Sequence, residues 1–401
     1  MNKQERLYSL DALRGFDMFF IVGGSGLIKA TAELFPSDFS TFIGTQMGHV
    51  AWHGFAFYDM IFPLFLFIAG VSFPFSFEKS TAAGVTKLQF MRKIFIRALK
   101  LFLLGLVINN ALNLDFENIR YASVLGRIGI AWMLGAIIYM YGGKKWAAIS
   151  TGIILLGYYF LAAFVPGPEA PAGASIFSAE GSIICWFDRQ YLPGLVLNNT
   201  YDPEGILSTI PAVATALLGI LTGIFLKSQK FTQNRKVLIL LAAAVVLTGI
   251  GLLWNEIFPI NKKMWTSSYV CFVGGLSLFL LTIFYWIIDI LKYEKWAFFF
   301  RVIGLNSITI YVAQKILNFH YSTDFLFNGF IRLFGETYSE VLYSFFYIVV
   351  IWIFLYFLYR KKHFPESLGN FQQETKDFSF PKIHFYTLKI RITLFLLKQL
   401  Q

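Results

Sequence analysis

Ten long apolar stretches, separated by shorter polar segments, dominate the pattern of hydrophobic positions along the chain. They lie near residues 12–28, 55–77, 94–112, 122–141, 146–165, 206–226, 237–254, 269–289, 299–318 and 339–359. Each is close to the roughly 20 residues that an α-helix needs to cross the hydrocarbon core of a bilayer. The pattern therefore predicts an all-α protein, a polytopic transmembrane helix bundle of about ten or eleven spans.

The composition agrees with a membrane protein and excludes several other classes. Of the 401 residues, 57% are hydrophobic and 14% are charged, whereas soluble domains carry about 25% charged residues. Cys185 lies in a long polar segment and Cys271 in an apolar one, so we expect neither a disulfide nor a cysteine-ligated metal. The sequence contains no Walker loop, no GxSxG and no HExxH motif. We therefore expect no metal ion and no nucleotide, serine or zinc hydrolysis.

Lysine and arginine are distributed unequally between alternate connecting segments. If the N-terminus is cytosolic, the outer segments hold mainly Lys29, Arg120, Arg189, Lys262, Lys263 and Arg332. The inner segments hold Lys79, Lys87, Arg92, Lys93, Lys144, Lys145, Lys227, Lys230, Arg235, Lys236, Lys292 and Lys295. The positive-inside rule then places both termini in the cytosol, and His49 and the loop of residues 166–205 outside. This asymmetry accounts for the net charge of +11, so no nucleic-acid partner is expected.

The chain is predicted to have one large membrane domain and a short tail. Residues 1–362 contain all the apolar stretches and form the predicted transmembrane domain. Residues 363–401 form a cytosolic tail, which is either an interfacial amphipathic helix or disordered.

A polar segment with two histidines leads directly into the second apolar stretch, GHVAWHGFAFYDMIFPLFLFIAGVSFPFS at residues 48–76. A carboxylate inside a spanning helix costs roughly 2.5–3.5 kcal/mol, so Asp59 is expected to face protein or a water-filled cavity. Pro63 cannot donate a hydrogen bond to the Asp59 carbonyl, and we expect the helix to be open there. His49 and His53 are then either active-site residues at the mouth of a kinked helix or ordinary loop residues.

Two further groups of charged residues each have two interpretations. Asp11, Arg14 and Asp17 are spaced to share one helical face, where they either cap and pair within the helix or hold a substrate phosphate. A basic cluster at the start of the third apolar stretch consists of Arg92, Lys93, Arg97 and Lys100. This cluster either anchors the protein to anionic lipid or binds the phosphates of a ligand.

Polar residues also occur within later stretches and in the outer loop. Arg127 is expected about two turns inside the outer boundary, where it either pairs with Asp59 or contacts substrate. Asn306 lies within a span, where an amide usually makes a helix–helix hydrogen bond. The loop of residues 166–205 is long enough to form a lid or an acceptor platform. It ends in Tyr201-Asp-Pro-Glu-Gly205, which is also a plain turn that starts a helix.

Several of these strings together resemble the heparan-α-glucosaminide N-acetyltransferase family of polytopic membrane proteins. The strings are His49-x-x-Trp52-x-Gly54, Asp59-x-x-Phe62-Pro63-x-Phe65-x-Phe67-x-x-Gly70, Asp202-Pro-Glu-Gly205, Asn261-Lys-Lys-Met-Trp-Thr-Ser-Ser-Tyr269 and Gly304-Leu-Asn-Ser-Ile-Thr-Ile-Tyr311. The similarity runs from about Leu7 to Tyr359. It implies transfer of an acetyl group from cytosolic acetyl-CoA to a glucosamine amine on the other side of the membrane. The chain looks like the short bacterial form, which implies the bacterial inner membrane.

The resemblance also implies roles for individual residues. His49 matches the active-site histidine of the family. An imidazole, with its ordinary pKa of about 6.5, can act either as a general base or as an acetyl acceptor. The implied catalytic residues are His49 and Asp59. Coenzyme A is expected to contact Arg14, Arg97, Lys100 and Arg127. The acceptor is expected to contact Trp52, Ser25, Asn306, Asp202 and Glu204, with Ser25 standing where the lysosomal branch has an asparagine.

The expected partners are acetyl-CoA, an amino-sugar acceptor, the lipid bilayer and a second copy of the chain in a homodimer. Two other functions stay open. Intramembrane Asp59, Arg127 and Asn306 also suit a transporter of a sugar or a lipid-linked sugar. An O-acyltransferase acting on envelope polysaccharide would instead use a hydroxyl acceptor.

Overall fold

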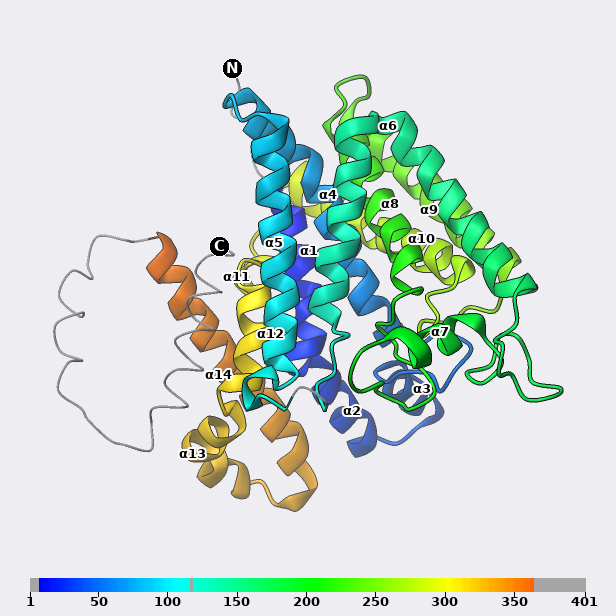
Figure 1. Ribbon diagram of the computed structural model, residues 1–401. Coiled ribbons are helices and arrows are strands. Elements are labelled where there is room, and N and C mark those ends of the chain that lie inside the picture. The colour runs from blue at the N-terminus through cyan, green and yellow to red at the C-terminus, as the bar shows by residue number, and fades with distance from the viewer. Residues whose placement is uncertain (1–6, 116–117, 364–401) are drawn as a thin grey trace. The chain divides into compact units, whose positions relative to one another are not determined.

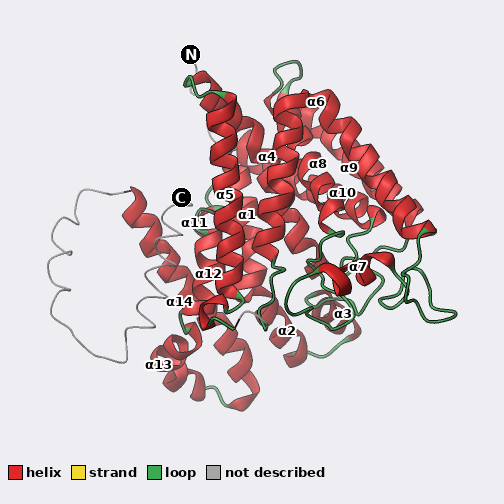
Figure 2. Cartoon of the chain, in the orientation of Figure 1, coloured by secondary structure: helices red, strands yellow, loops and turns green. Residues whose placement is uncertain are grey.

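A computed structural model describes residues 7–115 and 118–363 (Figure 1). Within these ranges the chain folds into helices and forms no strand, as Figure 2 shows, apart from two isolated bridges between loop residues. The all-α prediction is therefore confirmed. The tail predicted from residue 363 lies, beyond His363 itself, outside the described residues.

Six helices in the described part of the chain are long and apolar enough to cross a bilayer. They are Phe57–Ala82, Val124–Phe164, Thr209–Lys227, Gln233–Asn255, Ser267–Ile290 and Glu336–Lys361. The second of them, α6 (Val124–Phe164), contains two predicted spans joined at Gly143, whose φ of 68° bends the helix. These helices establish an integral membrane protein with a polytopic bundle.

The remaining predicted spans are also helical, but each is interrupted or charged. Residues 12–28 lie in α1 (Tyr8–Phe19), a π-helix (Phe20–Gly24) and α2 (Ser25–Leu34). Residues 94–112 lie mostly in α5 (Lys87–Ile108), which carries the basic cluster. Residues 299–318 form α11 (Phe298–Gly304) and α12 (Ser307–Ile316).

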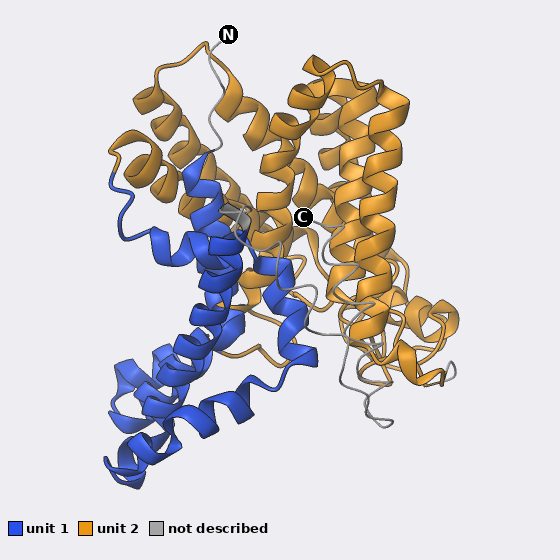
Figure 3. Cartoon of the chain, turned by 90° about the vertical axis from the view of Figure 1, so that its left-hand side faces the viewer, with its two compact units in different colours: residues 1–47, 293–401 blue, residues 48–292 orange. Residues whose placement is uncertain are grey.

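The chain divides into two compact units, coloured blue and orange in Figure 3. Unit 1 contains residues 1–47 and 293–401, and unit 2 contains residues 48–292. The single domain predicted for residues 1–362 stays a prediction beside this division.

Unit 1 is built around close contact between α1 and α11. A Cβ atom on Gly15 would lie 1.7 Å from the Phe300 carbonyl oxygen, and one on Gly304 would lie 1.9 Å from the Asp11 carbonyl oxygen. The two backbones therefore touch, which only glycine permits. The other helices of this unit are α3 (Asp38–Gln46), α13 (Phe319–Arg332) and α14 (Glu336–His363).

Unit 2 packs α4 and α6 against α8, and α9 against α10. Its helices are α4 (Ile61–Ala82), α5, α6, α7 (Ile183–Tyr191), α8 (Thr209–Lys227), α9 (Gln233–Asn255) and α10 (Ser267–Phe284), with a π-helix at Tyr285–Ile290. A Cβ atom on Gly219 of α8 would lie 2.1 Å from the Phe67 carbonyl oxygen of α4, and one on Gly70 would lie 2.3 Å from the Ala216 carbonyl oxygen. The glycine seam formed by Gly70 of α4 and by Gly219 and Gly223 of α8 holds these two helices in contact.

The predicted outer loops of unit 2 meet at one end of its helices. The Trp52 indole N–H donates to the Phe177 carbonyl at 2.7 Å, and the Gly54 N–H donates to the Ile260 carbonyl at 2.8 Å. Arg120 and Asp202, which lie in two other predicted outer loops, form an ion pair. These loops lie at the same end of the helices, as expected if successive spans cross the membrane in alternating directions. The cytosolic position of the termini stays a prediction.

Pro63 has the effect expected from its missing N–H group. It lies in the first turn of α4, which begins at Ile61, and Asp59 lies before it in a 3-10 turn (Phe57–Met60). The Asp59 carbonyl, which proline cannot bond, instead accepts from the Tyr269 hydroxyl of α10 at 2.8 Å. Asp59 is thereby placed at the end of the helix and fastened to a neighbouring one.

Candidate active site

His49 and Asp59 form a hydrogen-bonded pair at the end of unit 2 where the outer loops meet. His49 Nδ1 lies 2.7 Å from Asp59 Oδ1, and Asp59 Oδ2 accepts from the Ala56 N–H at 3.1 Å. The Asp59 side chain is 1% exposed and that of His49 is 49% exposed. An ionised carboxylate only accepts hydrogen bonds, so Nδ1 carries a hydrogen, and in the neutral imidazole Nε2 is then the nitrogen that keeps its lone pair. The pair thus presents a basic nitrogen to the outside of the bundle.

Lys262 lies beside this pair and was not selected from the sequence. Its Nζ is 3.1 Å from His49 Nδ1, 3.4 Å from His49 Nε2 and 3.4 Å from Asp59 Oδ1. Burial lowers the pKa of Lys262, while Asp59 and Glu204 act to raise it. The string Asn261-Lys-Lys-Met-Trp265 was the sequence signal that could have identified Lys262. From the sequence, its two lysines were interpreted only as charges of an outer loop.

The loop that carries Lys262 is held in one conformation by its neighbours in sequence. Trp265 has a φ of 53°, in the left-handed region that a bulky residue rarely adopts. Its N–H donates to the Lys262 carbonyl at 3.1 Å, and the Met264 N–H donates to Asn261 Oδ1 at 2.9 Å. These bonds close a tight turn that directs Lys262 toward the His49–Asp59 pair.

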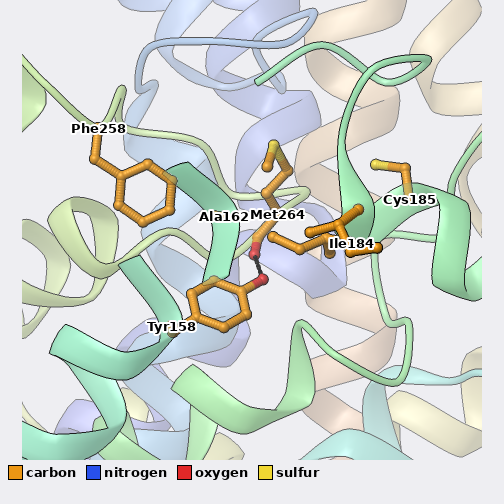
Figure 4. Close-up of a cluster of buried hydrophobic side chains, with 7 residues drawn as sticks. Tyr158, Ala162, Ile184, Cys185, Phe258 and Met264 are labelled. Carbon is orange, nitrogen blue, oxygen red and sulfur yellow. Dashed lines mark hydrogen bonds between the residues drawn. The ribbon is translucent and has the colours of Figure 1, made fainter. Parts of the chain in front are cut away.

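An apolar cluster that includes Met264 holds this turn (Figure 4). The Tyr158 hydroxyl of α6 donates to the Met264 carbonyl at 2.6 Å, the hydrogen bond drawn in Figure 4. Phe258 and Cys185 belong to the same cluster. Burial raises the pKa of the Cys185 thiol to about 12, so this cysteine stays protonated and acts as an apolar packing group.

Trp52 and His53 are fixed by the same loops. The Trp52 ring lies 4.8 Å from the Tyr201 ring, edge to face, and its indole N–H donates to the Phe177 carbonyl. His53 Nδ1 lies 3.4 Å from Asn261 Nδ2, and burial lowers the pKa of His53. The structure places Trp52 in the wall formed by the outer loops, and its predicted contact with an acceptor stays a prediction.

Asp202 and Glu204 pair with Arg120. The Arg120 guanidinium donates to both Asp202 oxygens, at 2.8 and 2.6 Å, and also pairs with Glu204. Asp202 additionally accepts from the Leu197 N–H at 3.2 Å, and its side chain is fully buried. These contacts give Asp202 a loop-fastening role, so its predicted role in substrate binding stays a prediction without support from the geometry.

Gly205 completes this turn because no larger residue fits. A Cβ atom there would lie 1.7 Å from Asp188 Oδ2 of α7. Asp188 Oδ1 accepts from the Ile206 N–H at 2.8 Å, just before α8 begins. The DPEG turn is thus fastened on both sides, by Arg120 and by Asp188.

The predicted pairing of Arg127 with Asp59 is wrong. Asp59 is paired with His49 and Lys262, whereas Arg127 Nη2 bonds to Ser208 Oγ and to the Gly205 carbonyl at 3.2 Å. The Arg127 guanidinium lies 5.0 Å from the centre of the Trp265 ring. Among the described residues, its Nε and Nη1 atoms have no hydrogen-bond partner. The Asp59 carboxylate is paired with two loop residues, His49 and Lys262. The depth of Asp59 and Arg127 along their spans does not predict these partners.

A cavity of about 580 Å³ lies beside Arg127, in the range usual for ligand sites. Apolar side chains of α6, α8 and the loops before these helices form most of its wall, together with Phe102 of α5. Its polar wall residues are Tyr121, Ser123, Arg127, Glu204 and Thr209. Sequence reasoning missed this cavity because its walls come from segments that are distant in the chain.

The other predicted site residues make local contacts. Arg14 Nη1 lies 3.4 Å from Asp11 Oδ1, the Ser25 hydroxyl donates to the Phe20 carbonyl at 2.9 Å, and Asn306 Nδ2 donates to the Val302 carbonyl at 3.1 Å. The Arg97 guanidinium lies 5.0 Å from the centre of the Trp132 ring. Roles for these residues and for Lys100 in binding a ligand stay predictions.

The fold and the site together define a polytopic integral membrane protein with a histidine–aspartate pair at one end of its bundle. Comparison with known proteins adds the family. Residues 6–252 match the family model described as heparan-alpha-glucosaminide N-acetyltransferase, catalytic. The chain belongs to this family.

Two curated relatives carry the same name. The mouse heparan-alpha-glucosaminide N-acetyltransferase is 28% identical over 373 residues, which cover 79% of this chain and 56% of the mouse protein. The human protein is 26% identical over 373 residues, which cover 79% of this chain and 55% of the human protein. The chain therefore spans about half the length of these relatives.

Proposed function

We propose that this protein is a transmembrane N-acetyltransferase of the bacterial inner membrane. It moves an acetyl group from cytosolic acetyl-CoA to the amine of a glucosamine-containing sugar on the periplasmic side. The observation that carries the proposal is the 2.7 Å contact between His49 and Asp59, within the segment that bears the family motif. The names of the family and of its curated relatives support the reaction class.

The geometry of the pair suits proton transfer at Nε2. The sugar amine attacks the thioester carbonyl carbon and forms the new C–N bond, while Nε2 of His49 takes a proton from the amine. The carbonyl π electrons move to oxygen and then return as the C–S bond breaks. The leaving thiolate receives the proton from Nε2. Asp59 accepts from Nδ1–H throughout, which fixes the tautomer and stabilises the imidazolium, as in other carboxylate–histidine pairs.

The same pair also suits covalent transfer. Nε2 would then attack the thioester carbon, displace the thiolate and carry the acetyl group until the amine removes it. Both routes use the same nitrogen and generate an oxyanion on the acetyl carbonyl.

The donor requires a site that extends from the membrane surface to His49. The cavity beside Arg127 supports binding of an apolar arm, because its wall is mostly aliphatic with a few polar groups. Arg97 and Lys100 of α5 are the proposed contacts for the coenzyme A phosphates, since several cationic donors suit phosphate groups.

The test uses purified protein in sealed, oriented vesicles with labelled acetyl-CoA on the cytosolic face and glucosamine on the other. Wild-type protein should form labelled N-acetylglucosamine. His49→Ala should lower the rate by about 10²–10⁴-fold, the usual loss when a general base is removed. His53→Ala is the matched control, since His53 lies in the same loop and contacts Asn261 instead of Asp59.

Three outcomes would overturn the proposal. If His49→Ala keeps more than half of the wild-type rate, His49 is not the base or nucleophile. Transport of labelled sugar without acetylation would indicate a transporter. Acetylation of hydroxyl groups with the amine unmodified would indicate an O-acyltransferase.

A further inference from the structure

We propose that Lys262 supplies the positive charge that stabilises the oxyanion formed on the acetyl carbonyl during transfer. This inference rests on the proposed acetyltransferase function and adds a residue to its site. The observation behind it is the position of the Lys262 ammonium, 3.4 Å from His49 Nε2, the nitrogen at which the reaction takes place.

The ammonium does not serve as a hydrogen-bond donor to His49 Nδ1, although the two atoms are 3.1 Å apart. Nδ1 already donates its hydrogen to Asp59 and has no lone pair to offer in that direction. The contacts of the ammonium to Nε2 and to Asp59 Oδ1, both 3.4 Å, are long and therefore weak as hydrogen bonds. Lys262 therefore acts on the pair as a charge, and its N–H groups can turn to a stronger acceptor.

A tetrahedral oxyanion beside Nε2 is such an acceptor. When the amine or Nε2 attacks, the thioester carbon gains a bond and the carbonyl oxygen takes the π electron pair as a full negative charge. That oxygen lies one bond from the carbon that Nε2 serves, within reach of an ammonium 3.4 Å from Nε2. The charge returns to the C=O bond when the thiolate leaves. A fixed cation that meets this transient charge lowers the barrier, because the substrate carbonyl carries much less charge before attack.

The loop is built to hold this cation in place. Lys262 is only 15% exposed and sits on a tight turn closed by Trp265, whose indole N–H donates to Thr215 Oγ1 at 3.2 Å. The Trp265 ring also packs edge to face on Phe62 of α4, 4.9 Å away. Because Phe62 and Asp59 lie in consecutive turns of the same segment, the Lys262 turn and the His49–Asp59 pair rest on a common support. Such fixed positioning is what electrostatic stabilisation of a transition state requires.

The charged groups that face Lys262 predict a pH dependence. They are His49 and Asp59 at the distances given, together with Glu204 and Lys263. Burial lowers the pKa of Lys262, so the ammonium should lose its proton at a lower pH than an exposed lysine. The rate of the wild-type protein should then fall at high pH as Lys262 is neutralised. Arginine in its place stays charged over the whole range, because a guanidinium is not deprotonated in proteins.

The experiment measures kcat, KM for acetyl-CoA and KM for glucosamine as a function of pH in four proteins. These are the wild type, Lys262→Met, Lys262→Arg and Lys263→Met. Lys262→Met should lower kcat by about 10²–10³-fold, as when one oxyanion donor is removed, with little change in either KM. Lys262→Arg should retain more activity than Lys262→Met and lose the decline at high pH. Lys263→Met removes the same charge from the adjacent residue, which contacts the Ala51 carbonyl, and should leave kcat near that of the wild type.

The proposal is overturned if Lys262→Met keeps more than half of the wild-type kcat, or if its loss lies in KM alone. It is also overturned if Lys262→Arg shows the same decline at high pH as the wild type, a test that remains if the methionine variant fails to fold. Inactivity of the wild type with every amino sugar would count against the acetyltransferase function itself. An active wild type with an active Lys262→Met protein would count against the role of Lys262 only.

Discussion

Replacing Asp188 by asparagine tests how the DPEG turn is fastened to α7. Asp188 is 1% exposed, and its Oδ1 accepts from the Ile206 N–H at 2.8 Å. Burial raises the pKa of Asp188 from its ordinary value of 3.8 to about 7, with Arg127 and Arg189 acting to lower it. The folded protein thus prefers the protonated, uncharged form of this side chain.

The sign of the effect follows from proton binding. Between about pH 4 and pH 7 the folded protein holds a proton at Asp188 that the unfolded chain has released, so stability falls as pH rises through this window. Each pKa unit corresponds to about 1.4 kcal/mol, so the shift from 3.8 to about 7 amounts to about 4 kcal/mol above pH 7. Asparagine keeps an oxygen for the Ile206 N–H and carries no charge, so the variant should not show this loss.

The assay is thermal unfolding of the purified protein in detergent at several pH values from about 4 to about 8. A change of 1 kcal/mol moves the midpoint by about 2–4 °C for a unit of 150–250 residues. The two proteins should therefore nearly coincide at pH 4, where the loss has hardly begun, and diverge by roughly 8–16 °C near pH 8, where the full difference of about 4 kcal/mol applies. Glu169→Gln removes an exposed carboxylate from the same loop and should follow the wild-type curve. Parallel curves for Asp188→Asn and the wild type would refute the reasoning.

Two further predictions concern packing and ion pairs in unit 2. Arg120→Met leaves the buried Asp202 carboxylate without its partner and should lower the free energy of unfolding by about 3–5 kcal/mol, measured by thermal or denaturant unfolding, and a loss below 1 kcal/mol would show that the pair is dispensable. Gly219→Ala should destabilise the protein, because its Cβ would lie 2.1 Å from the Phe67 carbonyl oxygen, whereas Gly249→Ala in α9 meets no atom within 4 Å and should be neutral or stabilising in the same unfolding assay.

The sequence predicted the helices and part of the site because both depend on local pattern. Apolar length located the spans, and Pro63 predicted the open carbonyl of Asp59. The clustering of the outer loops followed from their alternation along the chain. The segment that contains His49 and Asp59 was also found, since the two residues are only ten positions apart.

The remaining parts of the site depend on contacts between distant segments. Lys262 is 213 residues from His49, and no spacing rule connects them. Arg127 and Asp59 were expected to pair because their depths match, but depth does not specify which spans are neighbours. In the structure Arg127 bonds to Ser208 at the start of α8, and the carboxylate is engaged by a loop that follows α9. Side-chain pairing across a bundle requires the packing order of its helices.

The glycine seam between α4 and α8 has a consequence for motion in unit 2. Phe67 and Val71 of α4 present carbonyl oxygens only 2.1 and 2.3 Å from where Cβ atoms would stand on Gly219 and Gly223. Two helices in such direct backbone contact have no layer of side chains between them that could slide or repack, so we expect α4 and α8 to move together. If the proposed site at His49 exchanges substrates, movement of α4 past α8 is then not the route, and rearrangement of the loops around His49 is the simplest alternative, as in enzymes gated by lids. A pump that alternates access by shearing one helix past another would need a looser seam at this position.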